Sequence, residues 1–162
     1  MKSHITKLLI GLSALLFVVI AADVSNAQNS RRARGRQYTK ADVDRVIKRV
    51  EERMDNFVGN FDKSLDNSNL DGSDREDQLN AKAKALESAT DELRREFDKR
   101  DAWIENKDEV RRCLNLATDL DKTMKARKLG GVTESNWAKV RYELNTLAGI
   151  YNLPKVGNSA YK

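Results

Sequence analysis

The sequence predicts an all-α protein, an antiparallel four-helix bundle that follows a cleaved signal peptide. Apolar residues recur every three or four positions in four segments, the spacing of an amphipathic helix. The single proline, Pro154, lies near the end of the chain, and few glycines fall inside the four segments. Such segments can form long helices, and each has one apolar face to bury. Because short links join them, we expect an antiparallel bundle over residues 40–153.

The first 27 residues have the pattern of a secretory signal peptide. Two lysines precede an apolar run from Leu8 to Ala22, and Ser25-Asn26-Ala27 provides small residues for cleavage before Gln28. The 15-residue run is shorter than the roughly 20 residues that span a bilayer. The alternative is an uncleaved anchor, which the arginines after the run favour. We expect cleavage, no transmembrane segment in the mature chain, and a periplasmic or secreted location.

Residues 28–39 form a short basic arm. Residues 28–40 hold five basic and no acidic residues, whereas residues 41–162 hold 23 basic and 24 acidic ones. The arm has little apolar content and is expected to be disordered by itself. Its cations are suited to lipid headgroups or an anionic polymer. The alternative is a solubilising tail or a second processing site. The arginines are Arg31, Arg32, Arg34 and Arg36.

The first predicted helix runs from about Lys40 to Leu65. Thr39 is suited to cap its first turn, with Asp42 at the third helical position. Tyr38 and Val43 stand where a hydrophobic staple would place them. The apolar stripe consists of Val43, Ile47, Val50, Met54, Phe57, Phe61 and Leu65.

The second predicted helix runs from about Asp74 to Ile104 and begins with a capping box, Ser73-x-x-Glu76. The third begins near Asn106, where Asn106-x-x-Glu109 resembles another cap. A single helix from 74 to 127 is the alternative, but it would be about 80 Å long and has no equally long partner. The two stripes are Leu79, Ala83, Leu86, Thr90, Leu93, Phe97 and Ile104, then Val110, Cys113, Leu114, Ala117, Leu120 and Met124.

Gly130-Gly131 ends the third predicted helix, and Thr133 is expected to cap the fourth. Val132 and Trp137 are placed to form its hydrophobic staple. Pro154 ends this helix, so residues 154–162 are predicted to be a flexible tail. The stripe consists of Trp137, Val140, Leu144, Leu147, Ala148 and Tyr151.

Several chemistries are excluded by composition. Once residues 1–27 are removed the chain has no histidine, because His4 is the only one. This excludes a histidine-ligated haem, di-iron sites built on Glu-x-x-His, histidine–cysteine zinc sites and histidine-dependent catalysis. No Gly-rich phosphate loop is present. We therefore predict no catalytic residues, no cofactor and no enzyme.

Cys113 is the only cysteine, so the chain has no internal disulfide. It lies in the apolar stripe of the third helix, and we expect a buried thiol. The alternatives are an intermolecular disulfide or a reactive thiol.

The link Asn67–Gln78 resembles an EF-hand-like calcium loop with Gly72 at the sixth position. Its ligands would be Asn67, Asn69, Asp71 and Ser73. Position one lacks an aspartate, position nine is Arg75, and position twelve is Gln78, which cannot bind through two carboxylate oxygens. We expect a capped hinge instead, with weak calcium binding as the alternative.

The apolar stripes are expected to form the core rather than an open groove. Trp103 and Trp137 are the candidates for a protein interface, since tryptophan is enriched at binding hot spots. Both could lie near the bundle ends, and either would mark a binding surface if it is exposed.

Two stretches carry a resemblance to a group of proteins. E-F-D-K-R-D-A-W at 96–103 and N-W-A-K-V-R-Y-E-L-N-T-L-A-G-I-Y-N-L at 136–153 resemble a pattern of small exported all-helical bacterial proteins of unassigned function. The resemblance implies export and a helical fold, and it implies no activity and no site.

These observations lead to one functional expectation and two alternatives. We expect a non-catalytic module that binds a protein partner in the bacterial envelope, as an interaction or holdase-like domain. One alternative is anion binding through the basic arm, and the other is a weak calcium-binding bundle.

Overall fold

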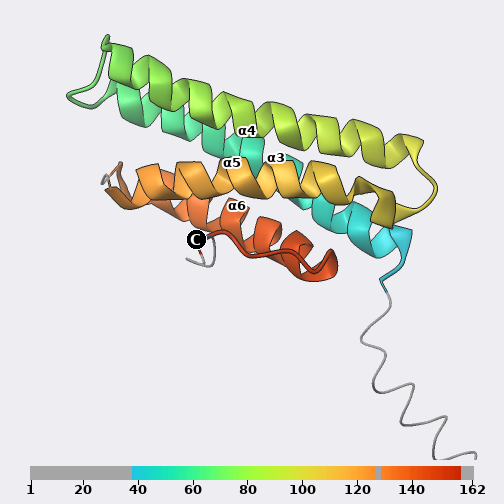
Figure 1. Ribbon diagram of the computed structural model, residues 1–162. Coiled ribbons are helices and arrows are strands. Elements are labelled where there is room, and N and C mark those ends of the chain that lie inside the picture. Colours follow the sequence, from blue (N-terminus) through green and yellow to red (C-terminus); the bar gives the residue numbers. More distant parts are fainter. Residues whose placement is uncertain (1–37, 127–128, 158–162) are drawn as a thin grey trace, which may run out of the picture. The chain divides into compact units, whose positions relative to one another are not determined.

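The computed structural model describes residues 38–126 and 129–157, and over these residues the chain is a helical bundle without strands (Figure 1). The predicted signal peptide (1–27) and arm residues 28–37 lie outside the described residues. The predicted all-helical bundle is confirmed over the described residues, because all of their regular elements are helices. Its elements are α3 (Lys40–Asp66), α4 (Asp74–Lys99), the short 3-10 helix η1 (Trp103–Asn106), α5 (Lys107–Ala126) and α6 (Gly131–Ile150).

One apolar core lies between the four helices. Helix α3 packs against both α4 and α6, and α5 packs against α4 and α6, so every helix has two neighbours. All seven predicted stripe residues of α3 are buried. The ring of Phe57 packs at a tilt against those of Phe61 and Trp137, with centroids 5.2 Å apart in each pair, and the contact with Trp137 joins α3 to α6. None of the described helices is both long and apolar enough to cross a membrane.

The start of α3 is as predicted. Thr39 accepts a hydrogen bond from the backbone N–H of Asp42, and the Asp42 carboxylate accepts one from the backbone N–H of Thr39. This reciprocal capping box satisfies two of the backbone donors that a helix leaves free at its N-terminus. Tyr38 is partly buried against the core, and Val43 is fully buried.

The predicted break between the second and third helices is present, but α4 ends at Lys99 and not near Ile104. Arg100 is extended, and its guanidinium donates to the Glu105 carbonyl and to both carboxylate oxygens of Glu109. Ile104 is half exposed and lies outside the core. The prediction that Asn106 caps α5 is not met, since its side-chain oxygen has no hydrogen-bond partner among the described residues.

Helix α6 begins two residues before the predicted cap. Gly130 takes the N-cap position with φ +95°, a value that side chains disfavour. Thr133 is buried inside the helix, and its hydroxyl pairs with that of Ser64 and with the Asn60 carbonyl. Val132 is largely exposed, so it does not form the predicted staple with Trp137.

Residues 154–157 do not form the loose tail that was predicted. The chain turns back after α6 and runs beside it (Figure 1). Val156 is 4% exposed and belongs to the core, and its backbone N–H donates to Asn145 Oδ1 at 2.7 Å. Gly157 follows with φ +85° close to Asp121, a helix α5 residue. The predicted tail beyond residue 157 lies outside the described residues.

Candidate functional site

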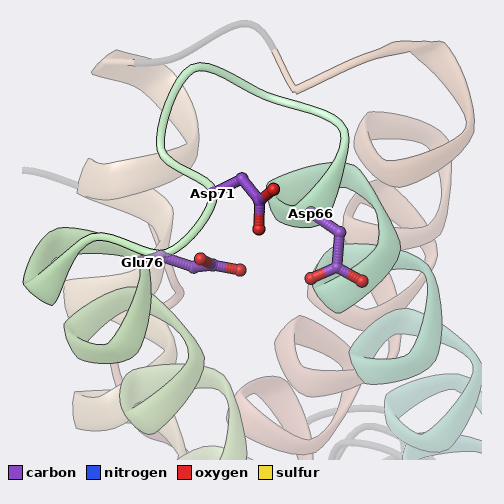
Figure 2. Close-up of side chains that lie close together, drawn as sticks. All are labelled: Asp66, Asp71 and Glu76. Atoms are coloured by element: carbon purple, nitrogen blue, oxygen red, sulfur yellow. The ribbon is translucent and has the colours of Figure 1, made fainter.

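Three carboxylates converge where α3 passes into α4 (Figure 2). Asp66 is the last residue of α3, Asp71 lies in the connecting loop, and Glu76 lies in the first turn of α4. Each offers an oxygen within 4.8 Å of the other two. Glu76 is buried and also accepts from the backbone N–H of Gly72 at 2.7 Å, while the two aspartates are exposed. Carboxylate oxygens are the ligands that Ca²⁺ and Mg²⁺ prefer.

The predicted calcium ligands are not brought together as a set. Asn67 donates through Nδ2 to the Lys63 carbonyl at 2.6 Å, and Ser73 caps α4 by accepting from the Glu76 N–H. Asn69 faces a polar hollow of about 590 Å³ between the end of α3 and the start of α6. Only Asp71 belongs to the acidic cluster. The EF-hand register therefore does not describe this loop.

Asp66 and Glu76 are not among the predicted ligands. Asp66 precedes the Asn67–Gln78 register, and Glu76 falls at its tenth position, which provides no ligand in an EF-hand loop; each lies five positions from Asp71. A signal was present in the sequence, since Ser73 predicts where α4 starts. That start places Glu76 in the first turn, facing back toward Gly72.

The proposed interface residue Trp137 lies in the core. It is 3% exposed, and its indole N–H donates to Asp121 Oδ1 at 3.1 Å. A partner cannot reach it while the bundle is folded. Trp103 is partly buried and packs edge-on against Tyr151, whose hydroxyl donates to the Trp103 carbonyl at 2.7 Å. Burial raises the pKa of Tyr151 above its usual range.

Asp121 is a buried carboxylate with three donors. It is 2% exposed and accepts from Trp137 Nε1, from Arg141 Nη1 at 3.0 Å and from Lys125 Nζ at 2.7 Å. Burial alone would raise the pKa of Asp121, but the hydrogen bonds from Lys125, Trp137 and Arg141 outweigh it and lower the pKa. Trp137 and Arg141 belong to α6, so Asp121 joins α5 to α6 through these contacts.

Cys113 is fully buried, as predicted, and its thiol donates to the Ala89 carbonyl at 3.3 Å. Burial raises the pKa of the thiol to about 12. The thiolate that would attack an electrophile is therefore scarce at neutral pH.

An acidic strip runs along α3 and α4. Burial, followed by the nearby carboxylates of Asp55 and Asp91, raises the pKa of Glu51 and Glu87, although Arg94 acts in the opposite direction on Glu51. Each glutamate lies four residues before an aspartate on its own helix, so like charges face each other along each helix. None of these four carboxylates forms an ion pair within residues 38–126 and 129–157.

The outer side of α6 has a different character. Tyr142 is 70% exposed and Val132 is 67% exposed, and the exposed Ser135 and Ala138 lie between them. At 100° per residue these four positions lie within about 120° of the helix circumference. We call this surface, defined by Val132, Ser135, Ala138 and Tyr142, the α6 outer face. Sequence reasoning missed it because the face lies outside the apolar stripe.

The predicted arm residues Arg31, Arg32, Arg34 and Arg36 lie outside the described residues, and their role stays a prediction. No protein-family model, curated protein or solved structure matches the chain.

Proposed function

We propose that this chain is an exported, non-catalytic interaction module that binds a protein partner through the α6 outer face. The observation that carries the proposal is the exposure of Tyr142 and Val132 on one side of α6. Two of the three large, exposed hydrophobic residues among the described ones lie there. An amphipathic helix of a bundle normally turns its second side to water with charged residues. Tyrosine is enriched at protein interfaces, whereas serine, alanine and valine are not, so Tyr142 is the residue of this face that favours contact with a partner.

The proposal also includes two expectations from the sequence, the antiparallel arrangement of the helices and the export of the chain. The helices are taken as antiparallel because a seven-residue link, 67–73, and a four-residue link, 127–130, join long neighbours. The first 27 residues are taken as a cleaved signal peptide, and the chain as one of the small exported helical bacterial proteins that it resembles. A mature protein beginning at Gln28, measured by intact mass after expression in a bacterial host, would support this part.

Site-specific photo-crosslinking tests the partner proposal. A benzophenone amino acid replaces Tyr142, and a matched variant carries it at the exposed Asp119 of α5, on another helix. We expect a discrete adduct from position 142 in intact cells that is absent from position 119. Adducts that are the same from both positions, or no adduct from position 142, would refute binding through this face.

A second candidate function is favoured by the convergence of Asp66, Asp71 and Glu76. Three carboxylates within 4.8 Å are a suitable ligand set for a divalent cation, which would hold the α3–α4 connection closed. Like charges so close also repel one another, and a cation would relieve that repulsion.

Thermal unfolding with millimolar Ca²⁺, with Mg²⁺ and with neither tests this candidate. A ligand at about 100 times its dissociation constant adds about 2.7 kcal/mol, which raises the melting temperature by several degrees. The rise should disappear in Asp71→Asn and persist in Asp119→Asn, the control on α5. A melting temperature unchanged by both cations would eliminate the cation site.

A further inference from the structure

Two adjoining hollows lie along the seam between α3 and α6. One, of about 270 Å³, is lined by Glu52, Arg53, Asn56, Asn136 and Lys139. The other, of about 320 Å³, is lined by Arg53, Ser135, Ala138, Lys139, Tyr142 and Glu143. Since Arg53 and Lys139 line both, the hollows form one groove, which we call the α3–α6 groove. It borders the α6 outer face, with which it shares Ser135, Ala138 and Tyr142.

A buried carboxylate of this groove faces two arginines, of which Arg53 lines the groove and Arg49 does not. Glu143 is 2% exposed, and its Oε1 accepts from Arg53 Nε at 3.2 Å. Arg49 Nε lies 3.0 Å from Oε2, close enough for an ion pair although its direction does not make a hydrogen bond. One carboxylate therefore faces two guanidinium groups, and one positive charge remains uncompensated.

The arginines are left with free donors. Each uses only its Nε toward Glu143, and the terminal Nη groups of Arg49 and Arg53 donate no hydrogen bond within the described part of the chain. A guanidinium binds a carboxylate best through paired N–H donors, so a fixed Nε leaves the Nη groups positioned for a second acid. Lys139 adds an exposed ammonium without an ion pair among the described residues.

The groove also has an apolar edge and a definite length. Tyr142 and Ala138 line the hollow that contains Glu143, beside the cations. From Ser135 to Glu143 the helix rises about 12 Å, at 1.5 Å per residue. This equals about four residues of extended chain at roughly 3.3 Å each. A single small anion would occupy only part of such a surface.

We infer that the α3–α6 groove binds an acidic peptide segment of a partner protein, with carboxylates on Arg53 and Lys139 and an apolar side chain against Tyr142. The inference rests on the proposed function, because it names the chemistry of the partner that the α6 outer face contacts. Glu52 is the one exposed carboxylate lining the groove, and it weakens the attraction without reversing it.

The test measures binding of a fluorescent eight-residue peptide, six acidic residues and two leucines, by anisotropy against the full chain. Its control is the same peptide with glutamine and asparagine in place of the acids. We expect the acidic peptide alone to bind, and to bind more weakly as salt rises. Lys139→Gln should weaken binding about two- to fivefold, the effect of one exposed charge. Glu52→Gln should strengthen it by a similar factor.

Lys82→Gln, which removes an exposed lysine of α4, is the matched control and should leave binding unchanged. Neither Lys139 nor Glu52 forms an ion pair in the described structure, so both variants are expected to fold with the melting temperature of the parent. Equal binding of the two peptides would overturn the inference. So would a Lys82→Gln effect as large as that of Lys139→Gln, since binding would then follow net charge and not the groove.

Failure of the inference and failure of the proposed function are distinguishable. If the crosslink from position 142 forms but the acidic peptide does not bind, the inference fails and the module proposal survives. If the peptide binds but position 142 gives no crosslink in cells, the proposed function fails. Inorganic phosphate that binds the chain where the peptide does not would replace the inference with a small-anion site.

Discussion

Replacing Asp121 with alanine provides the most direct test of how the bundle is held together at its α5–α6 side. The substitution removes the acceptor of three donors that come from Lys125, Trp137 and Arg141. Trp137 is buried, so its indole N–H loses its partner without gaining water. The two cations are partly exposed and can be hydrated where they are.

The cost is the sum of unequal contributions. A buried donor left without an acceptor costs about 1–3 kcal/mol. Each partly exposed ion pair contributes at most about 1 kcal/mol. Together these give about 1–5 kcal/mol for Asp121→Ala. A domain of about 120 residues has an unfolding entropy near 0.25 kcal/mol/K, so the melting temperature should fall by about 4–20 °C. Asp121→Asn retains an acceptor for Trp137 and should lose roughly half as much.

Thermal unfolding followed by circular dichroism, together with urea denaturation, measures the change. Asp119→Ala is the matched control, because Asp119 lies two positions before Asp121 on the same helix and, among the described residues, forms an ion pair only with the exposed Lys122, at 3.0 Å. Its cost should stay below about 0.5 kcal/mol. If Asp121→Ala and Asp119→Ala lower the melting temperature equally, the reasoning from burial is refuted.

The same residue predicts a pH dependence. The folded-state pKa of Asp121 lies below its ordinary value of 3.8, so its ionised form stabilises the fold. That contribution is complete above the unfolded-state pKa and is lost as the pH falls through the folded-state pKa. The stability difference between the parent and Asp121→Asn should therefore be constant from pH 7 to about pH 5 and shrink below about pH 4. A difference that grows on acidification would contradict the assignment.

Three further predictions concern other parts of the bundle. Glu51→Gln and Glu87→Gln should each stabilise the fold by about 0.2–0.5 kcal/mol at pH 7, because the raised pKa of each glutamate means that its charged form is unfavourable in the folded state. Urea denaturation at several pH values should show that this gain disappears near pH 3, where the glutamates are protonated. Gly72→Ala should lower the free energy of unfolding by about 1 kcal/mol, as measured by thermal unfolding, because Gly72 has φ +69°, a conformation that side chains disfavour. An added Cβ meets nothing within 4 Å, so this cost would come from the backbone conformation, and an unchanged stability would contradict it. Cys113 should resist a thiol reagent at pH 8 in the native state and react on unfolding, and rapid native labelling would refute its burial.

The sequence predicted the helical elements well because their signals are local. Thr39 and Ser73 cap helices where short polar side chains meet the first apolar turn, and both caps are present. The stripe of α3 is buried along its full length because a 3.6-residue period defines one face whatever packs on it. The helix ends were predicted less accurately where a tertiary contact decides them, as at Arg100, which follows the last residue of α4 and binds Glu109.

The candidate sites depended on contacts that the sequence does not display. The loop pattern included Asp71, but Asp66 and Glu76 join it in the acidic cluster only because the turn folds α4 back toward α3. Tryptophan is enriched at interfaces, which made Trp137 a candidate, yet its side chain packs in the core against Phe57. Tyr142 was overlooked because no local rule separates a tyrosine that faces water from one that lies inside.

By itself, then, the sequence determined the all-helical class, the four helical segments, the absence of histidine after His4 and the charge of the N-terminal arm. Those properties follow from residue counts and from periodicity along a single chain. The tertiary structure decided that Glu143 of α6 holds Arg49 and Arg53 of α3, that Asp121 is buried beneath three donors, and that Val156 joins the core. These arrangements join residues up to about a hundred positions apart, and only the packing of one helix against another determines which of them meet.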